Sequence, residues 1–113
     1  MVSEVREVSY HEILKRIEKT FQELRDMVKK KGSEYSSEAD ILSNFRDGMH
    51  LTGLGADYYL LSLMAKHVIW LYSEARKKET PNKALFREHK RDIILYLELL
   101  DCLYFDEHKQ SGG

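Results

Sequence analysis

Two acidic residues, Glu88 and Asp92, stand four positions apart in a segment, 86–105, whose apolar spacing predicts a helix. At about 100° per residue, Asp92 shares a helix face with Tyr96 and Leu99, and Glu88 lies about 40° from it. We expect this face to be buried. A buried carboxylate must be ion-paired, hydrogen-bonded, protonated or bound to a metal. Two neighbouring carboxylates on an apolar face therefore mark a candidate site.

Magnesium binding is one use for this pair, because Mg²⁺ prefers oxygen ligands and accepts one or two protein carboxylates together with substrate phosphates. Under that interpretation Glu88 and Asp92 are metal ligands and catalytic residues. The competing interpretation is a structural ion pair, in which Lys66 or an arginine from another helix neutralises Asp92. The sequence leaves both interpretations open.

Lys66, His67 and Tyr96 are the next candidates. A lysine can neutralise phosphate charge, and a histidine can donate a hydrogen bond to phosphate or move a proton. We therefore consider Lys66 and His67 as catalytic residues. His67 is expected on the flank of an apolar face, where a lone histidine is more often a hydrogen-bonded structural residue. Tyr96 follows Asp92 by one turn, so its hydroxyl could contact the carboxylate or its ring could lie beside a base. As a core aromatic residue it needs no function.

Further ligand-binding candidates precede these residues in the chain. Glu34 and Tyr35 fall in the segment 31–37, whose serines and backbone amides could hold a phosphate beside a helix N-terminus. Helix capping alone also explains those serines. Asn44 lies beside an apolar stripe, where its amide could contact a base or a carboxylate, or could make a structural hydrogen bond. Glu34, Tyr35, Asn44 and Tyr96 are thus the candidate cofactor-binding residues.

The elements that position these residues are all predicted helices. Ser9 and Glu12 form a capping box that begins the first helix, and Gly32 is the residue expected to end it. A loop is expected over 32–37, after which Ser36 or Ser37 would cap a short second helix.

The third and fourth helices have clear expected limits. The third runs from about Ala56 to Lys77 and is apolar nearly all round. For the fourth, Thr80 is the expected N-cap and Pro81 the first helical residue, with the end near Phe105. We predict an all-α protein with a compact four-helix arrangement. Its parts would be an N-terminal arm (1–8), a single helical domain (9–106) and a flexible tail (107–113).

Two very apolar helices in a chain of 113 residues leave excess hydrophobic surface. A homo-oligomer that packs through these helices would bury this surface, which makes a homo-oligomer the expected assembly. The alternative is that the short second helix and its loop cover it.

Composition excludes several classes of protein. A net charge of −1 argues against general nucleic-acid binding, and no apolar run approaches the length of a membrane span. One cysteine, Cys102, allows no internal disulfide, which suits a reducing cytoplasm. The chain has no Walker loop, dinucleotide fingerprint or paired C-x-x-C motif. Because the single cysteine suits a reducing compartment and no membrane span is predicted, we expect a cytoplasmic location.

Taken in chain order, the candidate residues form a recognisable series. It comprises Lys31-Gly-Ser-Glu34-Tyr35, Asn44-Phe45, Lys66-His67 and Glu88-x-x-x-Asp92-x-x-x-Tyr96. This series resembles the small phage and bacterial family called nucleotide modification associated domain one. That family is similar to the MazG-like all-α nucleoside triphosphate pyrophosphatases. The resemblance extends over about 31–100.

The resemblance implies a helical fold around a nucleotide site, in which acidic residues hold Mg²⁺. It further implies hydrolysis of a nucleoside triphosphate to monophosphate and pyrophosphate. Glu88 and Asp92 match the second acidic pair of the relatives, whereas the first, E-x-x-E, has only Glu23-Leu-Arg-Asp26 as a counterpart of similar form. This chain also has Ser36 where the family usually has glycine, and Leu95 where it usually has asparagine.

Two functional hypotheses follow. The first is a phage-associated, nucleotide-handling protein of the host cytoplasm that hydrolyses a nucleoside triphosphate with Mg²⁺. The second is a non-catalytic phage counter-defence protein that sequesters a nucleotide signal or inhibits a host protein. The expected partners are therefore a nucleotide or nucleotide-derived small molecule, further copies of the chain, and in the second case a host protein.

Overall fold

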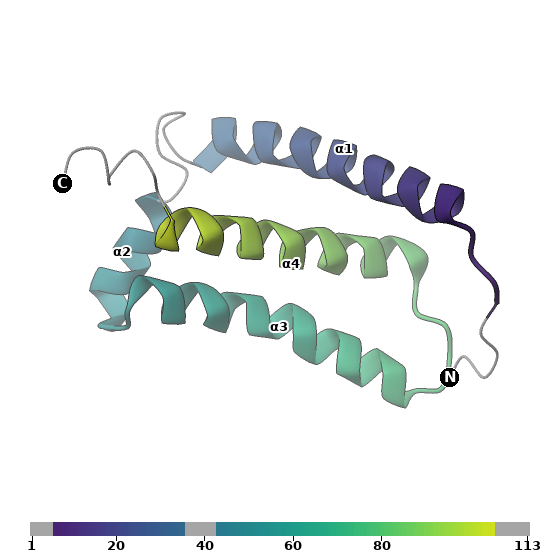
Figure 1. Cartoon of the computed structure of the whole chain (residues 1–113). Helices are drawn as coiled ribbons and strands as arrows, with labels where there is room; N and C mark the ends of the chain where they lie inside the picture. The colour runs from purple at the N-terminus through teal and green to yellow at the C-terminus, as the bar shows by residue number, and fades with distance from the viewer. Residues whose placement is uncertain (1–5, 36–42, 106–113) are drawn as a thin grey trace.

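The computed structural model of the chain describes residues 6–35 and 43–105, and the surroundings of side chains for 6–30 and 47–105. Over this part of the chain every regular element is a helix. The four helices are α1 (Tyr10–Tyr35), α2 (Ser43–Thr52), α3 (Ala56–Arg76) and α4 (Lys83–Tyr104), and they pack together (Figure 1). The predicted all-α fold with four helices is confirmed.

The start of α1 is the predicted capping box. The Ser9 Oγ accepts a hydrogen bond from the Glu12 backbone N–H at 3.2 Å, which satisfies one donor of the first turn. The Glu12 carboxylate forms an ion pair with Arg6 at 2.5 Å, which lowers the pKa of Glu12 through the hydrogen bond first and the charge second. The ion pair thereby links Arg6, which precedes α1, to the first turn of that helix.

The predicted end of α1 at Gly32 is wrong, because the helix continues to Tyr35. Glu34 and Tyr35 therefore belong to the last turn of α1 and not to a loop. A glycine inside a helix costs only about 1 kcal/mol relative to alanine. The residues around Gly32 are compatible with a helix, so the helix does not have to end at this glycine. The proposed caps of the second helix, Ser36 and Ser37, lie outside the described residues.

The turn between α2 and α3 depends on a glycine with positive φ. Gly53 has φ of 73° and its N–H donates to the Met49 carbonyl at 2.9 Å, which closes α2. The next helix begins after Gly55, so α2 folds back on the start of α3. Gly48 allows the close approach, because a β-carbon at this position would overlap the ring of Tyr59.

The predicted limits of α3 agree with the structure to within one residue, but the predicted start of α4 is wrong. Asn82, and not Thr80, is the N-cap of α4, and its side-chain oxygen accepts from the Leu85 backbone N–H at 3.0 Å. Pro81 thus precedes the helix by two positions. Asparagine is at least as good an N-cap as threonine, and here it lies three residues before the donor that it satisfies.

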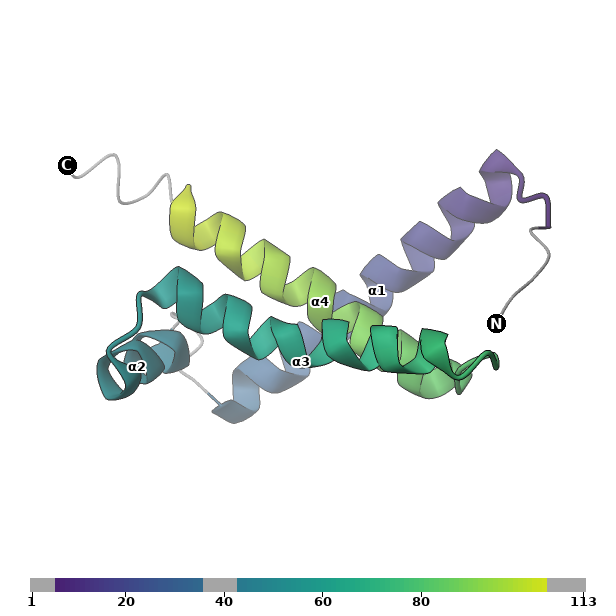
Figure 2. The same ribbon diagram turned by 90° about the horizontal axis from the view of Figure 1, so that it is seen from below.

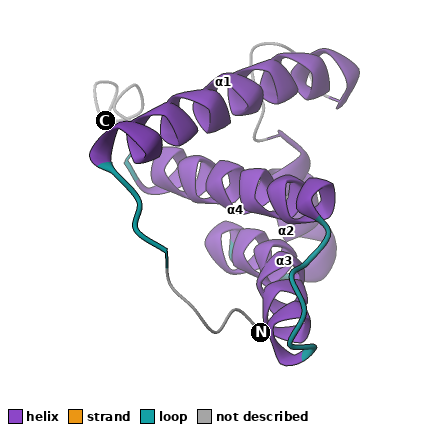
Figure 3. Ribbon diagram, turned by 90° about the vertical axis from the view of Figure 1, so that its right-hand side faces the viewer, coloured by secondary structure: helices purple, strands orange, loops and turns teal. Residues whose placement is uncertain are grey.

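Helix α4 lies between α3 on one side and α1 on the other (Figures 1 and 3). The α3–α4 contact is the most extensive between any two of these helices, and at one end the Tyr104 hydroxyl donates to the Asp57 carboxylate at 2.6 Å. In contrast, α1 crosses α4 at a steep angle (Figure 2). The crossing is held by Lys90 Nζ donating to Thr20 Oγ1 at 3.1 Å and by the 2.8 Å ion pair of Arg91 with Glu23.

The core of the described chain is small. Its buried hydrophobic residues are Leu24, Leu60 and Leu99, whereas Ile13, Leu14, Ile17 and Phe21 on α1 each leave between 44% and 51% of their surface exposed. The molecule is elongated, with extents of 52 × 31 × 26 Å. None of the four helices, over the residues described, has the length and apolar character needed to cross a membrane.

Candidate functional site

Two histidines join α3 to α4 at the centre of their contact. The Nδ1 atoms of His67 on α3 and His89 on α4 lie 2.8 Å apart, and both side chains are partly buried. Two imidazole nitrogens at this distance form a hydrogen bond only when one carries the proton and the other accepts it. The pair can therefore hold one proton between two rings, which is an arrangement suited to proton transfer.

Asp92 lies beside this pair. Its Oδ2 is 3.7 Å from the His67 Nδ1, and each of the two side chains exposes 17% of its surface. The predicted buried position of Asp92 is therefore partly realised, since the carboxylate is recessed but still reaches the surface. It can stabilise positive charge on the His67 imidazole, or accept a hydrogen bond from a ligand that approaches the two histidines.

Tyr96 completes the cluster one turn further along α4. Its ring centroid lies 5.7 Å from that of His67. Burial raises the pKa of the Tyr96 hydroxyl, and the negative charge of Asp92 and the neighbouring Tyr59 raise it further. The phenol is thereby kept protonated, so that it can serve as a hydrogen-bond donor beside Asp92.

Trp70 forms one side of the cluster. Its ring stacks on the imidazole of His89 with centroids 4.1 Å apart and an interplanar angle of 20°. This contact restricts the orientation of His89 and so directs its Nδ1 toward His67. Trp70 and His89 are not among the predicted site residues. The spacing of Trp70 three residues after His67, and of His89 three residues before Asp92, is the signal that could have identified them.

Of the predicted site residues, the structure brings together His67, Asp92 and Tyr96. Glu88 and Lys66 are exposed side chains on α4 and α3, each within one turn of this cluster. Glu34 and Tyr35 are in the last turn of α1 and Asn44 is in the first turn of α2, where side-chain surroundings are not described.

A second polar site lies where α1 crosses α4. A cleft of about 30 Å³ is lined by Arg16, Lys19, Thr20, Glu23, Arg87 and Lys90. Burial lowers the pKa of the Lys90 ammonium group, and the positive charge of Arg87 lowers it further. Four cationic side chains around one glutamate can attract an anionic group to the mouth of the cleft. These residues come from two helices about 70 positions apart in the chain, so their spacing in the sequence does not indicate that they form one cleft.

The carboxylates of the described residues are dispersed. In the part of the chain that the structure describes, no three His, Cys, Asp or Glu side chains are grouped so that they could hold an ion. Glu23 and Asp26, the candidates for a first acidic pair, are engaged with Arg91 and Gln22 respectively. Glu88 and Asp92 are one turn apart on α4, with Glu88 exposed and Asp92 partly buried.

Comparison with known proteins identifies no relative of this chain: no protein-family model, no curated protein and no solved structure matches it.

Proposed function

We propose that this chain is a phage-associated, nucleotide-handling protein and that it binds a nucleotide or nucleotide-derived molecule at the α3–α4 contact. The observation that carries this proposal is the cluster of His67, His89, Asp92 and Tyr96, in which two Nδ1 atoms lie 2.8 Å apart and a carboxylate lies 3.7 Å from one of them. Such a cluster offers donors for phosphate oxygens and an acceptor for a hydroxyl or amino group.

The chemistry of the cluster suits a nucleotide better than an apolar ligand. His67 and Tyr96 can donate to phosphate, and Lys66, the residue next to His67, adds a positive charge at the surface. The face of Trp70 that is not stacked on His89 is a surface on which a base could lie. Lys66, His67 and Tyr96 also belong to the series that carries the sequence resemblance to a nucleotide-handling family, which supports the choice of ligand class.

In the enzymatic form of the proposal, Glu88 and Asp92 would hold Mg²⁺ together with the phosphates of a nucleoside triphosphate. Bound there, Mg²⁺ would polarise the phosphates and lower the pKa of water, which favours release of pyrophosphate and a monophosphate. The His67–His89 pair would accept the proton of the attacking water and release it to the departing pyrophosphate or to solvent, and Lys66 would neutralise phosphate charge. Glu34, Tyr35 and Asn44 are proposed as further contacts to the nucleotide.

Calorimetric titration with nucleoside mono-, di- and triphosphates, with and without Mg²⁺, tests the binding site. We expect a triphosphate to bind, and Asp92→Asn to weaken the binding at least tenfold in the presence of Mg²⁺. Asp101→Asn is the matched control, because Asp101 is an exposed aspartate on the same helix. Equal weakening by both variants, or none by Asp92→Asn, would remove Asp92 from the site.

The competing place for a phosphate is the basic cleft between α1 and α4. Lys66→Gln should weaken nucleotide binding if the phosphates lie at the α3–α4 cluster, whereas Lys90→Gln should do so if they lie in the cleft. Comparing the two neutralising variants in the same titration assigns the phosphates to one of the two sites.

A non-catalytic counter-defence role is the second candidate. The observation that favours it concerns the first acidic pair that a pyrophosphatase would need. Its candidates, Glu23 and Asp26, already contact Arg91 and Gln22, which leaves Glu88 and Asp92 as the proposed metal ligands. Such a protein would sequester a nucleotide signal, or inhibit a host protein through its exposed apolar surface. Binding of nucleotide without release of pyrophosphate supports sequestration, whereas the absence of any nucleotide effect supports a protein target.

Self-association in the cytoplasm is the remaining part of the proposal. Only three hydrophobic side chains, Leu24, Leu60 and Leu99, are buried among the described residues, while α1 exposes a continuous apolar stripe. A chain of this length needs more buried apolar surface to offset the entropy of folding. A homo-oligomer would provide it, and sedimentation at increasing protein concentration tests this.

A further inference from the structure

The basic cleft where α1 crosses α4 has an excess of positive charge. Its cationic lining residues are Arg16, Lys19, Arg87 and Lys90. Among the described residues none of these four forms an ion pair, and the one carboxylate of the lining, Glu23, is paired with Arg91 at 2.8 Å. With Arg91, five cations therefore accompany one carboxylate, in a chain whose net charge is −1. Such an excess attracts an anion.

The groups in the cleft can donate hydrogen bonds to that anion. Lys90 Nζ donates to Thr20 Oγ1 at 3.1 Å, which leaves two of the three ammonium hydrogens for a ligand. The Thr20 hydroxyl accepts this bond and keeps its own hydrogen as a donor. Burial lowers the pKa of Lys90 and the charge of Arg87 lowers it further, so a bound anion would offset a cost that is present in the free protein. Phosphate oxygens are suitable acceptors for these donors.

The size of the cleft limits the ligand to one charged group. Its volume of about 30 Å³ is enough for about two water molecules. The oxygens of a single group can enter this space, whereas the remainder of the ligand must lie outside it. A phosphate monoester carries a charge of about −1.5 to −2 at neutral pH, so it balances the cations better than a carboxylate does.

An apolar groove beside the cleft has space for the remainder of such a ligand. Its volume is about 210 Å³, and it shares Arg16, Thr20 and Lys90 with the cleft. Its other lining residues are Ile13, Ile17, Phe21 and Ile94, the first three of them about half-exposed. A cavity of about 150 Å³ can hold benzene, so this groove can hold a short alkyl chain or one ring. A sugar fits poorly, because its hydroxyls would have no polar partner against the isoleucines.

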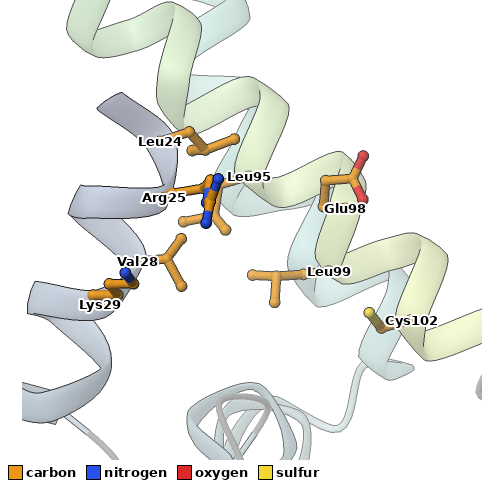
Figure 4. Close-up of a pocket in the computed structure, with 8 residues that line it drawn as sticks. All are labelled: Leu24, Arg25, Val28, Lys29, Leu95, Glu98, Leu99 and Cys102. Carbon is orange, nitrogen blue, oxygen red and sulfur yellow. The ribbon is translucent and has the colours of Figure 1, made fainter. Parts of the chain in front are cut away.

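A second groove, further along the same two helices, lacks this combination. Its volume is about 400 Å³, and Val28 and Leu99 point toward each other across it (Figure 4). Its charged lining residues are Arg25, Lys29 and Glu98, so its excess of positive charge is small. It shares no residue with the basic cleft. The charge of the cleft therefore distinguishes the smaller groove as the place for an anionic ligand.

We infer that the crossing of α1 and α4 binds a small phosphate monoester that carries a short alkyl chain or a single apolar ring. Its phosphate lies in the basic cleft, where Lys90 and Thr20 donate to the oxygens and the neighbouring arginines add positive charge. Its apolar part lies in the adjoining groove against Ile17 and Phe21. The site uses none of the residues of the α3–α4 cluster, so the inference is independent of nucleotide binding there.

Calorimetric titration of the full chain with small alkyl compounds tests both parts of the ligand. We expect hexyl phosphate to bind at least about tenfold more tightly than ethyl phosphate, because each buried methylene contributes about fourfold. Hexanoate, which has a smaller charge, should bind more weakly than hexyl phosphate. Hexanol should not bind at concentrations at which hexyl phosphate saturates the protein.

Neutralising substitutions test the place of the phosphate. Lys90→Gln removes the charge but keeps a side chain that can bond to Thr20, and it should raise the Kd for hexyl phosphate about tenfold. Arg16→Gln should raise it about threefold, because Arg16 is more exposed. Arg25→Gln is the matched control, an exposed arginine of α1 that lines the other groove, and it should change the Kd less than about twofold. Circular dichroism checks that each variant retains its helices.

Truncation tests the place of the apolar part. Ile17→Ala should raise the Kd for hexyl phosphate about fivefold and leave that for ethyl phosphate within about twofold, because only the longer chain reaches this side chain. Leu14→Ala is the matched control, since Leu14 is similarly exposed on α1 and does not line the groove.

The outcomes distinguish this inference from the nucleotide proposal. Absence of hexyl phosphate binding overturns it and leaves the nucleotide site standing. Equal affinity for ethyl phosphate or hexanoate overturns the ligand class, and equal effects of Arg16→Gln and Arg25→Gln overturn the location.

Two further results would assign the cleft to another ligand. Binding to vesicles that contain phosphatidic acid, without binding of hexyl phosphate, assigns this surface to a membrane and overturns the inference. Loss of nucleotide binding in Lys90→Gln assigns the cleft to nucleotide phosphates and also overturns it.

Discussion

The Nδ1 atoms of His67 and His89 lie 2.8 Å apart and connect α3 to α4 through a hydrogen bond between two imidazoles. Such a bond needs one protonated and one unprotonated nitrogen, so it exists only while the two Nδ1 positions share a single proton. Asp92, 3.7 Å from His67, is the nearby negative charge. The contact between α3 and α4 thus depends on the protonation state of the same side chains that form the candidate site.

His89→Gln should therefore destabilise the protein. The variant loses the hydrogen bond between the two imidazoles, which contributes about 0.5–1.5 kcal/mol. Urea unfolding of the original protein and of the variant at pH 7 gives the difference in the free energy of unfolding. An unchanged free energy of unfolding would contradict this account.

A matched substitution tests whether this loss is specific to His89. His50→Gln is the control, because His50 is exposed on α2 and far along the chain from the α3–α4 pair. It should change the free energy of unfolding by less than about 0.5 kcal/mol.

Tyr96→Phe should make stability less sensitive to alkaline pH. The pKa of Tyr96 is raised in the folded protein, chiefly by burial and then by Asp92, so folding favours the neutral phenol. This contribution is fully present below the unfolded pKa of about 10 and is lost as pH rises through the higher folded pKa. Between pH 9 and pH 11 the free energy of unfolding should fall more steeply in the original protein than in the variant. Parallel curves would show that Tyr96 does not titrate with folding.

Gly48→Ala should destabilise the α2–α3 contact even though alanine is the better helix former. Intrinsic propensity favours alanine by about 1 kcal/mol, but its β-carbon would overlap the ring of Tyr59. Overpacking of this kind costs about 1–3 kcal/mol. We expect Tyr59→Leu to recover part of the loss, which a double-mutant cycle from urea unfolding would measure.

Gly53→Ala separates this steric effect from a backbone effect. Gly53 has φ of 73°, and among the described residues there is open space where the alanine methyl group would lie. The cost of this substitution therefore arises from backbone conformation and is about 1–2 kcal/mol. Tyr59→Leu should not recover it. Recovery of both glycine variants by Tyr59→Leu would show that the ring is not the specific cause.

Leu60→Ala should be among the most destabilising single truncations. Leu60 is fully buried, with 0% of its surface exposed, and truncation leaves a cavity that costs about 2–5 kcal/mol. Leu51→Ala is the matched control, since Leu51 is 88% exposed and its truncation should cost less than about 0.5 kcal/mol. Similar losses for the two leucines would contradict the described packing.

Local residue patterns predicted the helices but not all of their ends. Ser9 caps α1 as expected, because capping involves atoms only three residues apart. Gly32 and Thr80 failed as boundaries because each has an alternative of similar free energy: continuation of the helix in one case, and capping by Asn82 in the other. Boundaries of this kind depend on differences of about 1 kcal/mol that tertiary contacts can reverse.

The candidate site was predicted in part. The wheel position of Asp92 beside Tyr96 and the position of His67 on an apolar flank agree with their common location between α3 and α4. Their pairing with His89 and Trp70 requires the rotation and axial register of two helices, which hydrophobic spacing defines only to within a turn. Glu88, expected to share the buried face with Asp92, is exposed, because the contact with α3 covers only part of that face.

The sequence by itself determined that this chain forms four helices and that an acidic residue, a histidine and a tyrosine occupy their recessed faces, because these properties follow from local spacing along each helix. Only the tertiary structure decided that His67 and His89, 22 residues apart, share a hydrogen bond, and that α1 crosses α4 at an angle that leaves a groove open. Both depend on how side chains of separate helices interlock, which no single helix specifies.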